Sequence, residues 1–523
     1  MGDGVAVASR TPQAAYSLIT LAIVFLAAGA QSAGVSWPFF FGFETGQPLW
    51  WLQCAALGAL VGVLHRCNNW KQAAGLGLLF ATVWLCATFW WLYISMHIYA
   101  GLSSVLTALA IVSLAFALGL YYAAACGIYW KLKADSPFIA SVSFAALWTM
   151  AEMARGTWLT GFGWGAIGYA HITGPLAPYV PWVGAYGVGV LAAWLAAGLV
   201  LALHSGNGLR LALATVVGVG LLAPVGPSAW SQPAGKLSVT LLQGNIPQDE
   251  KFQSGSGIPL ALQWYSDKLD RSTTDLVVAP ETALPVLPQD LPDGYWDRLA
   301  ARFSKGGQAA LVGSPWGNMQ EGYSNSVFAF GPNQAQEWRY DKHHLVPFGE
   351  FIPPLFKWFT RMMNIPLGDF NRGAIGQASY PWMGQRLALN ICYEDLFGEE
   401  LGARFIDAST APTVFVNVSN IGWFGDSVAI DQHLQISRMR ALEFERPMLR
   451  ATNTGATVII DHTGRVTNAL PRYTRGVLVG DVQGRTGTTP FAWWVARFGL
   501  WPLWVVSFAI VLLAAYARRT RAL

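Results

Sequence analysis

Long apolar segments separated by short polar ones fill the first 226 residues of the chain, and one more lies near its C-terminus. Each is close to the ~20 residues that an α-helix needs to cross a bilayer. The pattern predicts about eight membrane-spanning helices, at residues 16–34, 49–65, 73–95, 102–130, 137–155, 180–203, 209–226 and 492–516. The first segment could instead be a cleavable signal peptide, but its only basic flank is Arg10 and a second apolar segment follows at once, which favours a retained helix.

The stretch between the seventh and eighth apolar segments has a different pattern, in which short apolar runs alternate with amphipathic segments. The apolar runs are typical of strands and begin at Leu237, Asp275, Ala309, Ser326, Arg386, Thr413 and Ala456. Helices are expected near residues 258–272, 293–304 and 430–445, the last with Leu434, Met439 and Leu442 at near-helical spacing. This alternation favours a layered α/β domain. We therefore expect three parts, at residues 1–230, 231–485 and 486–523.

Composition agrees with a membrane protein. Hydrophobic residues make up 53% of the chain and charged residues only 12%, against roughly 25% charged residues in an average soluble domain. The net charge of +4 is small for 523 residues, and no Lys/Arg block is long enough to follow a phosphate backbone. These features argue against a nucleic-acid partner.

The basic residues predict the orientation of the chain, because Lys and Arg in short loops mark the cytoplasmic side. If the helices alternate, one side receives Arg66, Lys71, Lys131, Lys133, Arg210, Arg518, Arg519 and Arg521. The opposite loops carry little positive charge, with Glu44 in the first and Arg155 standing out in the third. Both termini are then cytoplasmic, and the large α/β domain faces outward. In a bacterium with two membranes that space is the periplasm.

Cys392 is the only cysteine in the hydrophilic stretch. Cys54, Cys67, Cys86 and Cys126 lie in or beside predicted membrane helices, where a thiol is usually a small buried hydrophobe. Cys392 therefore cannot form a disulfide within its own domain, although the predicted compartment is oxidising. It is either a buried inert thiol or a reactive one.

Two charged residues upstream of Cys392 favour the reactive interpretation. Glu281 and Lys342 each follow a predicted strand and Cys392 ends a third, so we expect the three side chains to meet at one edge of a sheet. A carboxylate can accept the thiol proton, while an ammonium lowers the thiol pKa and stabilises an oxyanion. The resulting thiolate would attack a carbonyl group and form an acyl-thioester. Taken singly, Glu281 could cap the turn after Pro280 and Lys342 could be a solvated charge.

Several short runs resemble those of the bacterial apolipoprotein N-acyltransferase family, a membrane-embedded branch of the nitrilase superfamily. These runs are QGNIPQ from Gln243, VVAPET, KHHLVPFGEFIP from Lys342, ICYED and SNIGWFGDS from Ser419. The resemblance implies a multi-span helical membrane domain with a nitrilase-like αββα sandwich outside the cytoplasm. It also implies acyl transfer from a phospholipid, typically phosphatidylethanolamine, to the α-amino group of the S-diacylglyceryl-cysteine of an apolipoprotein. The transfer would follow a ping-pong course through a cysteine thioester in the bacterial inner membrane.

The same resemblance implies roles for individual residues. Glu281 would be the base, Lys342 the oxyanion stabiliser and Cys392 the nucleophile. Supporting or substrate-binding roles would fall to Glu350, Tyr393, Glu394 and Phe252. Members of the family often have Trp where Phe252 stands, so the aromatic character is kept without the indole N–H. Many have Asp where Ile421 stands, and Ile421 receives no role.

An aromatic segment after the lysine is expected to admit lipid. The run PLFKWFTRMMNIPLG from Pro354 includes Trp358 and Phe359 and has few charges, which suits a membrane interface. Trp423 and Phe424 would assist from a second loop. The alternative is that the run is a core helix.

No metal or cofactor is expected. His343 and His344 are adjacent, so on a strand they would point to opposite faces and could not easily bind one ion. The expected partners are the membrane, a phospholipid donor and a diacylglyceryl-modified apolipoprotein acceptor, and the protein is expected to be a monomer. Two other functions stay open: an amidase acting on a small soluble amide, and a non-catalytic scaffold that binds lipoproteins.

Overall fold

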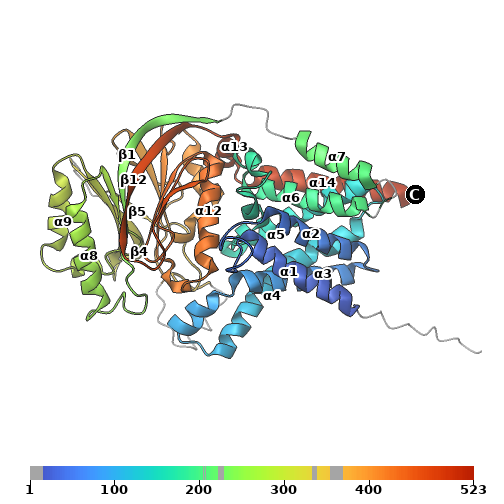
Figure 1. Ribbon diagram of the computed structural model, residues 1–523, viewed down its shortest axis with the longest axis horizontal. Helices are drawn as coiled ribbons and strands as arrows, with labels where there is room; N and C mark the ends of the chain where they lie inside the picture. Colours follow the sequence, from blue (N-terminus) through green and yellow to red (C-terminus); the bar gives the residue numbers. More distant parts are fainter. Residues whose placement is uncertain are drawn as a thin grey trace, which may run out of the picture.

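The computed structural model consists of a bundle of apolar helices and an α/β sandwich that lie end to end (Figure 1). It describes residues 16–203, 205, 208–221, 229–332, 338–353 and 369–522. The predicted fold class is confirmed, because a membrane-type helical domain and a separate two-sheet domain are both present.

All eight predicted apolar segments form helices. In chain order these are α1 (Leu18–Val35), α2 (Trp50–His65), α3 (Trp70–Phe89), α4 (Ser104–Leu132), α5 (Pro137–Thr157), α6 (Val180–Leu203), α7 (Gly208–Leu221) and α14 (Trp501–Ala522). In the described part of the chain, six helices are long and apolar enough to cross a membrane. The helix α2 has 16 residues and α7 has 14, so both are shorter. Hydroxyl and amide side chains start three of the helices, since Ser17, Asn69 and Ser103 each accept a backbone N–H of the first turn.

The last apolar segment is divided, where the sequence pattern predicts one helix over 492–516. A separate helix α13 (Pro490–Phe498) precedes α14. Gly499 lies between them with φ +54, a conformation that glycine adopts without steric cost. The buried side chain of Phe491 anchors α13 to the base of the sandwich and the start of α6. The membrane helix therefore begins at Trp501.

The sandwich contains two six-stranded sheets. The strand order of the first sheet is β12-β1-β2-β3-β4-β5 and that of the second is β11-β10-β9-β8-β7-β6. The first consists of β1 (Ser231–Gln243), β2 (Leu276–Val278), β3 (Ala309–Asn318), β4 (Gly322–Phe330), β5 (Trp338–Asp341) and β12 (Gly476–Gly487). The second consists of β6 (Tyr380–Trp382), β7 (Gln385–Ile391), β8 (Val414–Ser419), β9 (Met448–Thr452), β10 (Val458–Ile460) and β11 (Val466–Ala469). Each sheet mixes parallel and antiparallel pairs.

Three apolar layers hold the sandwich together. The inner faces of the two sheets meet in one core, to which Leu241 and Val278 contribute from the first sheet and Val416 from the second. The helices α8 (Gly257–Arg271) and α9 (Tyr295–Ser304) pack on the outer face of the first sheet. The helix α12 (Val428–Phe444), as predicted, lies on the second sheet, between the sandwich and the bundle (Figure 1). The order of layers is α-β-β-α.

Polar side chains fix α12 to the helical bundle and its connecting loops. The Oε1 atom of Gln432 accepts hydrogen bonds from the indole N–H groups of Trp91 at 3.0 Å and Trp164 at 2.8 Å. Glu443 Oε1 accepts the backbone N–H of Ala185 in α6 at 2.7 Å. Since all of these groups are buried, they fix the position of the sandwich on the bundle.

Candidate active site

Glu281, Lys342 and Cys392 meet at one end of the sandwich. Glu281 follows β2, and Lys342 directly follows β5, which runs in the same direction because two antiparallel steps separate it from β3. Cys392 follows β7. The expectation that all three share one sheet edge is wrong, because β7 belongs to the second sheet. The site therefore lies where the ends of two facing sheets come together.

The two charged groups of the predicted set are paired and buried. Lys342 Nζ lies 3.4 Å from Glu281 Oε1 and 3.0 Å from Glu350 Oε1. The side-chain N–H₂ of Asn325 donates to the same two carboxylates, at 2.7 and 2.8 Å. The second oxygen of Glu281 accepts the backbone N–H of Asn420 at 2.8 Å. Each carboxylate oxygen that accepts from Lys342 thus also accepts a hydrogen bond from Asn325, which holds it in place.

These contacts decide the charges of Glu281 and Lys342. Burial alone would raise the pKa of Glu281, but Lys342, the amide of Asn325 and Lys251 outweigh it and lower the pKa. Burial likewise opposes the charge on Lys342, but the carboxylates of Glu350 and Glu281 raise its pKa well above the ordinary value. At neutral pH the pair is therefore carboxylate and ammonium.

Cys392 has a strained backbone and a protonated thiol. Its φ is +55, which is unusual for a side-chain-bearing residue and points to a turn held by its surroundings. Ser419 Oγ donates to its Sγ at 3.5 Å, and Asn417 donates to its carbonyl oxygen at 2.8 Å. Burial and the negative charge of Glu281 raise the pKa of the thiol to about 12, although Lys342 and Ser419 lower it. The expected thiolate is therefore replaced at rest by a thiol, whose pKa is raised in part by the carboxylate of Glu281.

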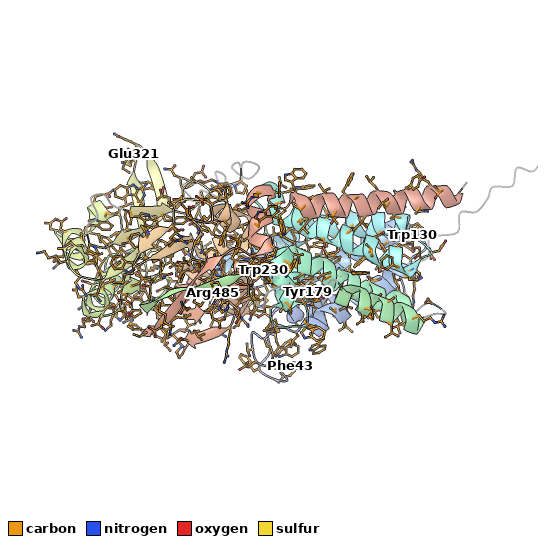
Figure 2. The ribbon with its side chains drawn as sticks, turned by 90° about the horizontal axis from the view of Figure 1, so that it is seen from above. Phe43, Trp130, Tyr179, Trp230, Glu321 and Arg485 are labelled. Carbon is orange, nitrogen blue, oxygen red and sulfur yellow. The ribbon has the colours of Figure 1, made fainter. Side chains whose placement is uncertain are left out.

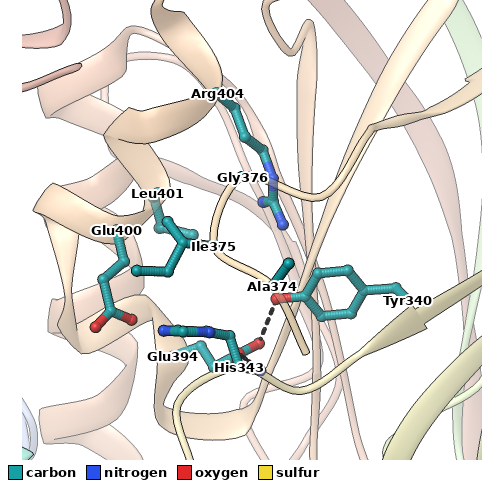
Figure 3. A pocket seen from close by; sticks show the side chains of 9 residues that line it. All are labelled: Tyr340, His343, Ala374, Ile375, Gly376, Glu394, Glu400, Leu401 and Arg404. Atoms are coloured by element: carbon teal, nitrogen blue, oxygen red, sulfur yellow. Dashed lines mark hydrogen bonds between the residues drawn. The ribbon is translucent and has the colours of Figure 1, made fainter. Parts of the chain in front are cut away.

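Glu394 ties the nucleophile turn to the loop that follows β5. It accepts the backbone N–H groups of Ile391 at 2.6 Å, His343 at 2.6 Å and His344 at 3.1 Å, and the hydroxyl of Tyr340 at 2.9 Å. Figure 3 shows the bond to Tyr340 at the wall of a small cavity. The cavity measures about 20 Å³, which is room for a water molecule and not for a cofactor. Glu394 therefore acts in the structure as a fixed anchor.

Tyr393 and the two histidines pack beside this anchor. Tyr393 is buried, and its hydroxyl donates to the carbonyl of Leu345 at 3.4 Å. His343 Nδ1 lies 2.7 Å from the carbonyl of Gly373, while His344 bonds Glu400 Oε1 and the carbonyl of Thr160, each at 2.9 Å. Both histidines lie in a loop after β5, so the strand geometry assumed for them is wrong. In the described ranges, no three His, Cys, Asp or Glu side chains are grouped to hold a metal ion.

The predicted aromatic residues differ in their surroundings. Phe252 is about half exposed, at 51%. Trp423 and Phe424 lie in a short helical turn (Ile421–Phe424) that touches the bundle. Trp423 meets Tyr99 edge-on at 5.7 Å, and Phe424 packs on Trp91 at 4.3 Å between ring centroids. Trp358 and Phe359 lie outside the described residues.

Lys251 is a site residue that the sequence pattern did not single out. Its side chain is only 1% exposed, and Nζ donates to the backbone carbonyl of Glu281 at 3.2 Å. Burial lowers its pKa to about 7, although Glu281 and Cys392 raise it. The neighbours Asp249 and Glu250 make the segment look like a solvated charged turn. The one available signal was its position directly before Phe252.

A buried polar network supports the turn that carries Cys392. Asp395, three residues after the cysteine, accepts from His433 Nε2 at 2.9 Å and from Arg450 Nη1 at 3.3 Å. Arg450 also lies 2.8 Å from His433 Nδ1, and Ser437 donates its hydroxyl to Asp395. His433 and Ser437 come from α12, and Arg450 comes from β9. The network therefore links the nucleophile turn to the helix that rests on the bundle.

Comparison with known proteins agrees with this architecture. The family model described as "Apolipoprotein N-acyltransferase N-terminal domain" matches residues 33–198, and the family model described as "Carbon-nitrogen hydrolase" matches residues 238–491. An apolipoprotein N-acyltransferase of Verminephrobacter eiseniae is 55% identical over 498 residues, which cover 90% of this chain and 91% of that protein. The chain belongs to the apolipoprotein N-acyltransferase family. A second member, from Ralstonia nicotianae, is 46% identical over 90% of both chains.

Family membership settles several expectations. The resemblance seen in the short sequence runs is confirmed, and the protein is an enzyme of the acyltransferase class built on the carbon-nitrogen hydrolase fold, so the scaffold alternative is set aside. It is a bacterial membrane protein. Among solved structures, an amidase from Nesterenkonia sp. aligns with 49% of this chain and 94% of its own, at 18% identity and a TM-score of 0.35.

Proposed function

We propose that this enzyme transfers an acyl chain from a phospholipid, typically phosphatidylethanolamine, to the N-terminal α-amino group of S-diacylglyceryl-cysteine in apolipoproteins. The relatives named apolipoprotein N-acyltransferase support the acceptor. The observation that carries the proposal is the buried set of carboxylate, ammonium and thiol formed by Glu281, Lys342 and Cys392. A covalent intermediate lets two lipid-anchored substrates use one site in turn.

In the first half-reaction, Cys392 attacks the ester carbonyl of the phospholipid. Glu281 accepts the thiol proton as the S–C bond forms, and the ammonium of Lys342 stabilises the oxyanion. Collapse of the tetrahedral intermediate breaks the bond to the glycerol oxygen, which takes the proton from Glu281. The products are a lysophospholipid and a thioester on Cys392.

In the second half-reaction, the neutral α-amine of the acceptor attacks the thioester carbonyl. Glu281 accepts a proton from the attacking nitrogen, and Lys342 again stabilises the oxyanion. Collapse expels the sulfur of Cys392, which regains its proton from Glu281. The product is an amide, and the enzyme returns to its starting state.

The remaining site residues act by positioning and by contact with lipid. Glu350 holds Lys342 between two carboxylates, Glu394 fixes the nucleophile turn, and Lys251 holds the backbone of Glu281. Tyr393, the residue after the cysteine, donates its hydroxyl to the carbonyl of Leu345. We assign contact with lipid to the predicted aromatic residues Phe252, Trp423 and Phe424, and also to Trp358 and Phe359, which lie outside the described residues.

The surroundings of the thiol favour a lipid substrate over a small soluble amide. Cys392 and Phe424 pack against an apolar cluster that continues without interruption into the membrane helices and includes Trp91 and Trp164. Transfer of an acyl chain from water to such a surface lowers its free energy, whereas transfer of a small polar amide does not. We further propose that the sandwich faces the periplasm, that both termini are cytoplasmic and that the protein works as a monomer.

The test uses purified full-length enzyme, phosphatidylethanolamine with a labelled acyl chain, and a synthetic diacylglyceryl-cysteine peptide. Label should reach the peptide amine with wild-type enzyme and not with Cys392→Ala. Transfer to the peptide by the alanine variant at the wild-type rate, or hydrolysis of a small amide in place of transfer, would contradict the proposed function.

A further inference from the structure

The loop between α1 and α2 exposes a group of aromatic side chains. Within residues 36–49, Phe40 is 96% exposed and Phe41 is 69% exposed. Trp37, Phe39 and Phe43 complete the group, and Glu44 is the one charged residue of this loop. An exposed apolar patch of this kind marks a contact with another apolar phase. We call these five aromatic residues and the turn that carries them the aromatic loop.

The aromatic loop is folded on its own contacts. The ring of Trp37 is the centre, with centroids 5.0 Å from Phe39, 6.2 Å from Phe41 and 5.4 Å from Phe43. Its indole N–H donates to the carbonyl of Phe41 at 2.8 Å, and its own carbonyl accepts the N–H of Gly46 at 2.8 Å. The rings are therefore presented on a preformed turn, so little conformational entropy is lost when they bind.

The aromatic loop is attached to the catalytic domain. Gln435 of α12 donates to the carbonyl of Gly46 at 2.7 Å. Gly46 has φ +85, and a Cβ atom there would lie 2.5 Å from Asp431 Oδ1, so only glycine fits against α12. The aromatic loop therefore has a fixed position against α12, the helix that packs on the second sheet.

The aromatic loop lies at the level where the helices end. It joins the sandwich-side ends of α1 and α2, and Phe43 is 5.8 Å from Trp51 in the first turn of α2. Figure 2 shows Phe43 at the junction of bundle and sandwich, on the outer margin of the molecule. This is the height of the headgroup region in a bilayer that the bundle spans.

We propose that the aromatic loop inserts into the phospholipid headgroup and upper acyl region of the leaflet on the sandwich side, and thereby fixes the depth of the catalytic domain. Aromatic rings partition to this zone because it combines apolar contact with hydrogen-bonding surroundings. A polypeptide partner would find few polar groups to recognise, since the loop carbonyls of Trp37, Phe39 and Phe41 already accept hydrogen bonds within the loop. This inference does not depend on the acyl-transfer chemistry.

The test places a benzophenone amino acid at Phe40 of the full-length protein in phospholipid nanodiscs. Illumination should give a phospholipid adduct at this position. The same probe at Met319, which is 92% exposed on the β3–β4 turn, serves as the control and should give none. No adduct at position 40, or an adduct formed only with an added apolipoprotein, would overturn the inference.

A second variant separates insertion from simple proximity. Phe40→Ser with Phe41→Ser, and the probe at Phe43, removes two exposed side chains outside the core of the bundle. Because Phe41 contacts the rings of Trp37 and Phe39 within the loop, an unchanged melting temperature in detergent is the control for the fold. Each phenylalanine contributes to partition into lipid, and the adduct yield should therefore fall by at least about tenfold. An unchanged yield would contradict insertion.

Discussion

The protonation states of a few buried side chains decide how the nucleophile is activated. Because Cys392 is a thiol and Glu281 a carboxylate at neutral pH, the proton moves as sulfur attacks carbon. The carboxylate of Glu281 must be free, so activity should be lost as the pH falls through its lowered pKa. Such a site keeps the thiol unreactive until a carbonyl group is present.

Glu350 determines how tightly Lys342 holds the catalytic carboxylate. In Glu350→Gln the ammonium keeps only Glu281 as an anionic partner, and Glu281 becomes a weaker base. Turnover should fall by at least about tenfold, measured as peptide acylation. The exposed Glu321→Gln is the control and should keep full activity. Wild-type turnover in Glu350→Gln would show that Lys342 needs no second carboxylate.

Lys251 should give the first half-reaction a pH dependence. The pKa of this amine is about 7, so its positive charge beside Glu281 and Cys392 is present below that pH and disappears as the pH rises. The rate of lysophospholipid release should decline through this range in the wild type, because a positive charge beside Cys392 that favours the developing thiolate is lost. Lys251→Met should release lysophospholipid more slowly, and its rate should not show this decline with pH.

The free energies of unfolding of the wild type and Lys251→Met provide a second test of this titration. The folded pKa of Lys251 is depressed, so the unfolded chain binds more protons between pH 7 and about 10. The wild type therefore gains stability relative to Lys251→Met as the pH rises through this range, which thermal unfolding in detergent measures. If the wild type and Lys251→Met had parallel pH profiles, for the rate and for the free energy of unfolding, Lys251 would not titrate in this range.

At the scale of elements, Gln432 is one of the buried side chains that hold α12 on the bundle. Gln432→Met keeps the size of the side chain but leaves the indole N–H groups of Trp91 and Trp164 without their acceptor. Two unsatisfied buried donors should lower the free energy of unfolding by about 2–4 kcal/mol. Leu434→Met on the same helix is the control. Equal melting temperatures of the two variants would show that Gln432 does not stabilise the contact between α12 and the bundle.

The elements that the sequence predicted are those whose apolar pattern is continuous. The runs LVV of β2 and VFVNVS of β8 are buried on both faces and read directly as strands. The strand β9 was missed because Arg450 interrupts it, and this charge is buried against Asp395. The strand β12 was missed because exposed and buried positions alternate with glycines in it. Long-range pairing, which local patterns do not contain, determines these two elements.

The same limit applies to the site. Glu281, Lys342 and Cys392 were predicted because each follows or ends an apolar run, and carboxyl ends of strands collect functional side chains. The run predicted before Lys342 belongs to β4, since the short strand β5 was not predicted. That Cys392 comes from the opposite sheet depends on how the two sheets face each other. Lys251 and Asn325 were missed for a different reason, since only the fold brings a turn residue and a mid-strand amide to the carboxylate.

For the whole molecule, the distribution of charge predicts which side of the membrane holds the sandwich. In Met319→Cys the new thiol should react with a membrane-impermeant maleimide in intact spheroplasts. Arg518→Cys, at the end of α14, should react only after the membrane is opened. The wild type, with its five cysteines, gives the background. The reverse labelling pattern would refute the periplasmic location and the lipoprotein acceptor with it.

The central claim is the thioester on Cys392, and it is tested by mass spectrometry of the wild-type protein incubated with phospholipid alone. The account predicts a peptide containing Cys392 that carries one acyl chain, loses it to hydroxylamine and appears together with lysophospholipid. Cys392→Ala should show neither product, and Cys392→Ser almost none, because a hydroxyl is far less acidic than a thiol. Lysophospholipid that appears only when the acceptor is present, with no adduct on Cys392, would contradict the account and favour direct transfer.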